Sequence, residues 1–168
     1  MPLQQTLQSF PVGLQPGHYA TTQSQFRFNF QAYCDLTNLA AIDQVYGTLV
    51  VRQADGTYAV PTVATIATGQ MGIVTYDYRL ISKQAYKPNE LLNLEMVGDR
   101  WVRCIPGIVI KAGDPIFVYV AGANAGIFSN VLDGVAANTR KIQGMWLDDK
   151  IAADLFAPIV FNLFAPAI

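Results

Sequence analysis

Short runs of alternating apolar and polar residues, separated by glycine, proline and aspartate, limit the fold of this chain more than any other feature. The clearest run, FRFNFQAY at residues 26–33, alternates phenylalanine with polar residues. Successive side chains of a β-strand point to opposite faces of a sheet, so a period of two is typical of a strand that is buried on one face. We therefore predict a half-buried strand over 26–33.

Further runs of this kind follow. The segment YGTLVVRQADGTYAVPTV, residues 46–63, predicts two strands joined at Asp55-Gly56, because Asp-Gly readily adopts the positive φ angles of a type I′ hairpin. Residues 72–81, GIVTYDYRLI, predict another strand. Two more hairpins are predicted, turning at Gly98-Asp99 and near Gly113-Asp114, since glycine followed by aspartate suits a type II′ turn.

The remaining segments are less regular. Residues 35–45 have the spacing of a short helical turn or a loop, and the glycine-rich stretch 122–138 predicts a long loop with room for one short turn of helix. A last strand is predicted from Pro158 to Phe164. One of its faces is formed by Ile159, Phe161 and Leu163, and the other by Val160, Asn162 and Phe164.

These patterns predict an all-β fold, a small β-barrel or sandwich of short antiparallel strands with little helix. Turn residues at roughly 8–12-residue intervals are typical of that class. The 168 residues suit one domain. Residues 1–17 contain no charge and carry three prolines and two glycines, without strand alternation. We therefore predict an extended N-terminal arm over 1–18 and a single β-rich domain over 19–168.

The composition bears on the partners of the chain. Charged residues make up only 14% and apolar residues 52%, whereas a charged share of about 25% is usual. Either uncharged polar side chains cover the surface, or much of it is buried against partner chains, and the second is favoured. The net charge of −1 argues against nucleic acid as a partner, because phosphates are bound by clustered lysine and arginine.

A membrane anchor and an export signal are not expected. The most apolar stretch, residues 155–168, contains two prolines and is shorter than the ~20 residues that a spanning helix needs. The first seventeen residues have neither the basic region nor the unbroken apolar region of a signal peptide. We expect synthesis in a cytoplasm and no contact with a membrane.

Chemical motifs are sparse. His18 is the only histidine, and Cys34 and Cys104 lie far apart, so no ligand pair has zinc spacing. The two cysteines are predicted to be buried free thiols. The pair Asp148-Asp149 lacks the spaced oxygen ligands of a calcium loop and is predicted to lie in a solvated turn. We predict no catalytic residue, no cofactor and no metal.

Several segments, taken in order, resemble a known family. They are the Pro/Gly-rich opening FPVGLQPGHYATTQSQ, the mid-chain GDPIFVYV and the terminal GMWLDDKIAADLFAPIVFNL. The chain resembles the structural cement, or capsid decoration, proteins of tailed bacteriophages. In that family a Gly-Asp turn leads into a central strand, and a Gly-x-aromatic segment leads to an apolar last strand. Gly144-Met145-Trp146 and the segment from Phe156 to Leu163 stand at these last two places, whereas residues 35–46 match nothing in the family.

The resemblance implies a structural virion protein that binds the outside of an assembled capsid, often as a trimer, and ties neighbouring major capsid protein subunits together. It implies no cofactor and no reaction. The location would be the outer capsid surface of the virion, after synthesis in the host cytoplasm. The uncharged arm would lie across a neighbouring subunit, with proline and glycine limiting its loss of entropy on ordering.

Two sets of contact residues follow from these expectations. The arm is predicted to contact the capsid through Leu3, Leu7, Phe10, Val12, Leu14 and His18. Self-association as a homotrimer is predicted through Trp146, Val160, Asn162 and Phe164, because the last strand is apolar on both faces and such a strand is normally covered on both.

Other interpretations stay open at this point. The chain could be another assembled virion component, such as a tail or fibre part. It could also be a soluble β-barrel ligand-binding module or a small enzyme. A repeated aromatic stripe opening onto a pocket would favour the binding module, and a histidine or a pair of carboxylates in that pocket would favour the enzyme.

Overall fold

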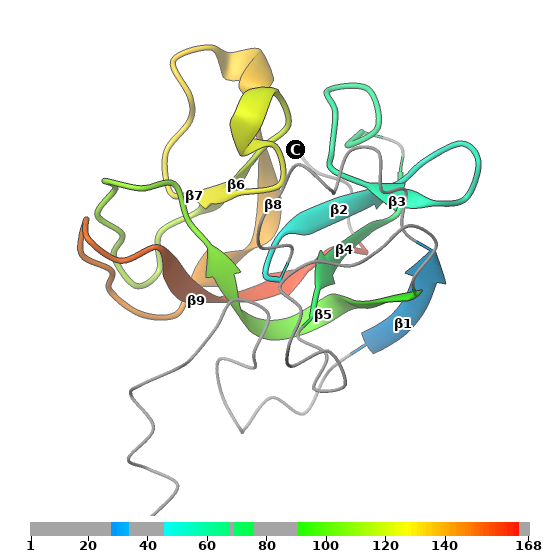
Figure 1. Ribbon diagram of the computed structural model, residues 1–168. Coiled ribbons are helices and arrows are strands. Elements are labelled where there is room, and N and C mark those ends of the chain that lie inside the picture. Colours follow the sequence, from blue (N-terminus) through cyan, green and yellow to red (C-terminus); the bar gives the residue numbers. More distant parts are fainter. Residues whose placement is uncertain (1–27, 34–45, 68, 76–90, 165–168) are drawn as a thin grey trace, which may run out of the picture.

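The computed structural model describes residues 28–33, 46–67, 69–75 and 91–164 (Figure 1). Within these ranges the regular structure consists of antiparallel β-strands and two short 3-10 turns, without an α-helix. The strands are β1 (Phe28–Tyr33), β2 (Leu49–Arg52), β3 (Tyr58–Ala59), β4 (Met71–Val74), β5 (Leu91–Arg103), β6 (Ile116–Tyr119), β7 (Phe128–Ser129), β8 (Thr139–Trp146) and β9 (Phe156–Asn162). The prediction of an all-β fold is confirmed.

The strands form one sheet that curls into a half-barrel. Its order is β3-β2-β4-β5-β9-β8-β6-β7, and β1 pairs with β5 outside this path. Strand β7, which is last in this order, also contacts the middle of the sheet. Phe128 on β7 forms a bridge with Cys104, just after β5. The amide of Ile105 donates to the Phe128 carbonyl at 3.0 Å, and the amide of Leu49 on β2 donates to the Gly126 carbonyl at 3.0 Å.

Two strands, β5 and β8, each pair with different neighbours along their first and second halves. The first half of β5 pairs with β1 and β4, and its second half pairs with β9. The first half of β8 pairs with β6, and its second half, from Gln143 to Trp146, pairs with β9. Gly144 lies at this change of partner with φ +145°. Strands that switch partners in this way form the corners of curved sheets.

The predicted turn at Gly98-Asp99 is wrong. Both residues lie inside β5, where Gly98 is opposite Phe161 and Asp99 is opposite Val160 on β9. A Gly-Asp pair reverses the chain only where the two flanking segments pair with each other. Here the flanking segments pair instead with three other strands, so the chain runs straight through for thirteen residues.

The other two predicted turns have different outcomes. The hairpin at Asp55-Gly56 is confirmed, since β2 pairs with β3. Its hydrogen bonds, from the Gly56 amide to the Gln53 carbonyl and from the Gln53 amide to the Thr57 carbonyl, are those of a three-residue loop ending in a glycine with positive φ, not of a two-residue type I′ turn. A turn is also present near Gly113, but no hairpin forms there. The segment before that turn bridges to Lys150 instead of pairing with β6.

The C-terminal third contains more strand than the sequence predicts. The last strand is confirmed with a two-residue shift as β9. The stretch 122–138 contains 3-10 turns at Gly122–Asn124 and Ala136–Asn138, but also the short strand β7. Strand β8 has no predicted counterpart.

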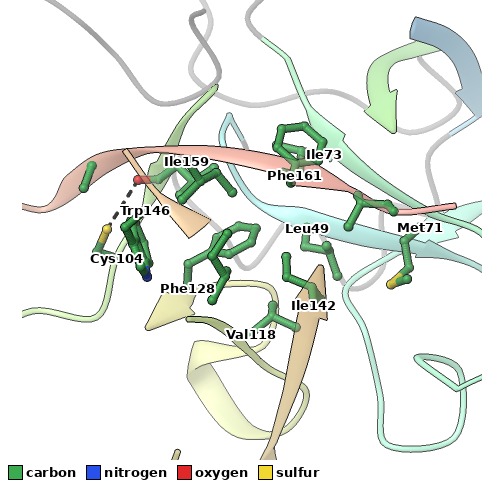
Figure 2. Packing of buried hydrophobic residues seen from close by; sticks show 14 of the residues in the cluster. Leu49, Met71, Ile73, Cys104, Val118, Phe128, Ile142, Trp146, Ile159 and Phe161 are labelled. Carbon is green, nitrogen blue, oxygen red and sulfur yellow. Dashed lines mark hydrogen bonds between the residues drawn. The ribbon is translucent and has the colours of Figure 1, made fainter. Parts of the chain in front are cut away.

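The core lies between the two halves of the curled sheet. Side chains of Ile159 and Phe161 on β9 lie with Leu49 of β2, Phe128 of β7 and Ile142 of β8 in one buried cluster (Figure 2). All five are at most 2% exposed. Contacts between strands that are distant in sequence therefore hold the half-barrel together, since burial of apolar surface is the main favourable term in folding.

Several predictions fall outside the described residues. The arm, residues 35–45 and most of the predicted strand at 72–81 belong to them, although β4 contains the beginning of that strand. The division into an arm and one domain stays a prediction. In the described part of the chain, no helix is long and apolar enough to cross a membrane.

Candidate interaction surface

The outer face of the β8–β9 pair carries most of the residues predicted for self-association. Val160 is half-buried, Asn162 is exposed and Phe164, just after β9, is 59% exposed. The alternate residues Ile159 and Phe161 are buried in the core. The predicted two faces of the last strand are therefore confirmed.

Strand β8 extends this outer face. Met145 lies opposite Val160, and Gln143 lies opposite Asn162. Met145 is 50% exposed, and Leu147, whose amide donates to the Pro158 carbonyl at 2.9 Å, is also exposed. We call the following six residues the β8–β9 strip: Gln143, Met145, Leu147, Val160, Asn162 and Phe164. None of them is charged, and uncharged apolar surface of this kind is typical of protein–protein contacts.

Trp146 does not belong to this surface. Its side chain is 1% exposed and packs in the core cluster (Figure 2). Its indole N–H donates to the Pro115 carbonyl at 3.1 Å. Side chains on β8 alternate, so Trp146 points inward between Met145 and Leu147, which point outward. A side chain without exposed surface cannot contact another chain, so its predicted role in self-association is replaced by a role in the core.

An aromatic pair continues the outer face onto β5. The rings of Trp101 on β5 and Phe156 at the start of β9 lie edge to face, with centroids 5.7 Å apart and an interplanar angle of 78°. Both side chains are half-buried. Edge-to-face pairs are a favourable arrangement of aromatic rings. They fix the beginning of β9 on β5 and leave part of both rings accessible.

A buried lysine organises the loop between β8 and β9. Lys150 is 2% exposed, and its ammonium donates to the carbonyls of Ile108 at 2.9 Å and Ile151 at 3.1 Å. Main-chain hydrogen bonds of 3.0 Å in both directions join Ile110 to Lys150. A buried ammonium is stable only where acceptors replace its water. The Ile108 carbonyl and the main-chain bonds of Ile110 therefore tie the β5–β6 loop to the β8–β9 loop.

The acidic pair beside this lysine lies in a solvated turn, as predicted, because Asp148 and Asp149 are both exposed. The Asp149 carboxylate accepts from the Ala112 amide at 2.9 Å and from the Lys111 ammonium at 3.0 Å. These contacts, the Ala112 amide first, lower the pKa of Asp149 below its usual value. Asp149 therefore stays ionised at neutral pH and links the same two loops.

Apolar side chains project from these linked loops. Val109 and Ile151, which flank the bridged residues Ile110 and Lys150, are 56% and 65% exposed. Leu155, just before β9, is 58% exposed. A rigid loop that holds apolar side chains in solvent needs little ordering when it binds a partner. This end of the hairpin is thus a second accessible apolar area beside the β8–β9 strip.

Other predicted chemistry is only partly covered by the structure. Cys104 is a free and buried thiol, as predicted, and burial raises its pKa to about 12. The described residues contain no group of three or more potential metal-ligating His, Cys, Asp or Glu side chains. Cys34 and the arm residues Leu3, Leu7, Phe10, Val12, Leu14 and His18 lie outside the described residues. The absence of catalysis stays a prediction.

Sequence reasoning missed Met145, Leu147, Val109 and Ile151 as exposed apolar residues. For β8 the signal was present, since Lys141, Gln143 and Met145 alternate with Ile142 and Trp146. Gly144 interrupts that pattern at an inward position. Val109 and Ile151 belong to irregular loops, where exposure has no periodic signal.

This fold is shared with a chain of a solved structure. A chain of the structure titled "The capsid of Myoviridae Phage XM1" superposes with a TM-score of 0.67 at 16% identity, over 90% of this chain and 92% of that chain. The shared fold covers nearly the whole length of both. No family model and no curated protein matches the sequence.

Proposed function

We propose that this chain is a structural virion protein that binds the outside of an assembled phage capsid and joins neighbouring major capsid protein subunits. The observation that carries the proposal is the fold shared with a chain of a phage capsid structure over 90% of this chain. The resemblance of its sequence segments to cement proteins is a separate line of support. The uncharged β8–β9 strip supports an assembled state, because exposed apolar patches mark interaction sites.

Mass spectrometry of particles purified from the phage or prophage that encodes this chain tests the proposal. The chain is expected in the particle in many copies, at a fixed ratio to the major capsid protein. Antibody labelling of intact particles is expected to decorate the head. Absence from particles, or labelling of the tail alone, would contradict a capsid role.

The arm is proposed to contact the capsid and to contribute little to the fold. A truncated chain beginning at His18 is expected to melt within a few degrees of the full chain and to bind heads more weakly. Circular dichroism measures the first quantity. Co-sedimentation with heads from a phage that lacks the gene measures the second. A truncated chain without far-UV signal would show that the arm is part of the core.

We also propose that the chain forms a homotrimer through the β8–β9 strip. Phe164→Asp places a charge on a side chain that is 59% exposed and is expected to shift the purified protein towards monomer. Truncation of an aromatic side chain at the centre of an interface typically costs about 2–4 kcal/mol. Sedimentation velocity at micromolar concentration measures the change.

Val63→Asp is the matched control for this substitution. Val63 is 42% exposed and lies in the loop between β3 and β4, and β3 is at the end of the sheet order, away from β8 and β9. The control is expected to leave the sedimentation coefficient unchanged. A wild-type protein that sediments as a monomer at all concentrations would exclude a trimer in free solution.

A further inference from the structure

The β8–β9 hairpin carries charges of opposite sign at its two ends. Lys141, exposed on the outer face near the start of β8, is followed along that face by Gln143, Met145 and Leu147. Asp148, also exposed, comes directly after them. At about 3.3 Å per strand residue, the lysine and the aspartate are about 20 Å apart. That is more than the Debye length of ~8–10 Å, so the two charges do not neutralise each other within one chain.

The loop end of the hairpin presents acidic groups to solvent. Asp154 is exposed just before β9. Among the described residues, the Asp148 carboxylate accepts from the neighbouring Asp149 amide at 2.8 Å. The positive groups nearby are already engaged. The Lys111 ammonium pairs with Asp149 at 3.0 Å, and the Lys150 ammonium is buried against carbonyls.

Asp114, at the turn before β6, also belongs to the loop end. Its carboxylate accepts from the Lys111 amide at 2.9 Å and from the Asn130 side-chain amide at 2.7 Å. It adds a further negative charge that forms no salt bridge with a lysine or arginine side chain in the described part of the chain. The loop end is therefore acidic at its surface.

The opposite end of the hairpin is basic at its surface. Arg140 is half-buried and donates to the Thr139 carbonyl at 2.9 Å, while Lys141 beside it is exposed. Asp133, the acidic group of the adjoining loop, is half-buried and accepts from the Asn138 side-chain amide at 2.7 Å. Lys141 is thus the charge that this end offers to a partner.

We propose that copies of this chain associate head to tail through this hairpin, with the acidic loop end of one copy against Lys141 of the next. The inference rests on the proposed homotrimer and adds its orientation. A closed ring of three chains has heterologous contacts, in which two different surfaces of the chain meet. Opposite charges at the two ends of one uncharged strip are complementary in that arrangement.

The charges also argue against the other simple arrangement. If three hairpins lay parallel to the threefold axis, three copies of Asp148 would gather at one end and three copies of Lys141 at the other. Like charges brought together in an interface oppose association. Hairpins that lie across the axis avoid this, and Met145 and Val160 between the charged ends then supply the apolar contact.

Charge reversal of the purified full chain tests the orientation. Lys141→Glu and Asp148→Lys are each expected to weaken association by about tenfold, because each turns an attraction into a repulsion at every contact of the ring. The double variant Lys141→Glu/Asp148→Lys is expected to regain most of that loss, since both ends are reversed together. Sedimentation equilibrium over a concentration series measures the three constants.

Two control variants distinguish an effect of charge on association from an effect of the substitution on the folded structure. Arg52→Glu, at an exposed position of β2, changes the net charge as Lys141→Glu does and is expected to leave association unchanged. Asp148→Asn keeps an acceptor for the Asp149 amide and is expected to weaken association less than Asp148→Lys. Circular dichroism melts are expected to be alike for all variants.

The outcomes bear separately on orientation and on capsid binding. A double variant that associates no better than the weaker single variant overturns the head-to-tail contact, and so does a monomeric or dimeric wild type. Wild-type protein that forms the trimer with the expected rescue, yet does not bind heads, would contradict the capsid function and leave the orientation supported.

Discussion

Gly144→Ala is expected to lower the free energy of unfolding by roughly 3–5 kcal/mol, the combined size of backbone strain and overpacking in a tight site. A Cβ at this position would lie 2.1 Å from the Val160 carbonyl oxygen and 3.0 Å from both the Phe161 Cα and the Ile116 Cδ1. Two of these three atoms are backbone of β9, so they cannot turn away as a side chain could. The φ angle of +145° adds strain for any residue with a Cβ.

Thermal unfolding measures this effect. A chain of this size loses about 2–4 °C of melting temperature per kcal/mol, so a drop of roughly 10 °C or more is expected. Gly107→Ala is the matched control, because Gly107 has φ +81° but no atom within 4 Å of a Cβ. If the two variants melted within a few degrees of each other, the close approach of β8 to β9 at Gly144 would be wrong.

The sequence predicted the strands whose alternation was uninterrupted. The hairpin of β2 and β3 and the two faces of β9 follow from the period-two pattern and an Asp-Gly turn, both of which act within a few residues. Those features are local, and local preferences decide them. The outward positions of Val160 and Phe164 could therefore be predicted without a structure.

Features that depend on distant partners could not be predicted in this way. Gly98 resembles a turn residue in the sequence, yet it lies inside β5 because β9, about sixty residues later, pairs there. Strand β8 was not predicted for a related reason. Gly144 stands at an inward position, where a glycine interrupts the alternation of apolar and polar residues. The need for a glycine at this position follows from the structure, in which the Val160 carbonyl oxygen lies where a Cβ would be.

The burial of Lys150 at the candidate surface could not be predicted from the sequence either. A lysine that directly follows two aspartates is typical of a solvated loop, because lysine is almost never fully buried without a partner. Its burial depends on the carbonyls of Ile108 and Ile151, and Ile108 lies far away in the sequence. The exposed apolar residues Val109 and Ile151 around it could not be predicted either, because their positions follow from this tie.

Trp146→Ala is expected to destabilise the fold by about 3–5 kcal/mol, the usual cost of removing a large buried aromatic side chain. Trp146 is 1% exposed and lies among core residues of several strands (Figure 2). Its removal also leaves the Pro115 carbonyl without the indole N–H that reaches it at 3.1 Å. Urea denaturation measures the loss.

Trp146→Phe separates packing from the hydrogen bond. It keeps most of the apolar contact and loses the N–H donor, so a smaller loss of about 1–2 kcal/mol is expected. Both losses are expected to be independent of protein concentration, because a core residue acts within one chain, whereas an interface residue changes stability through mass action. A Trp146→Ala protein with wild-type unfolding but weakened association would return Trp146 to the interface and contradict its place in the core.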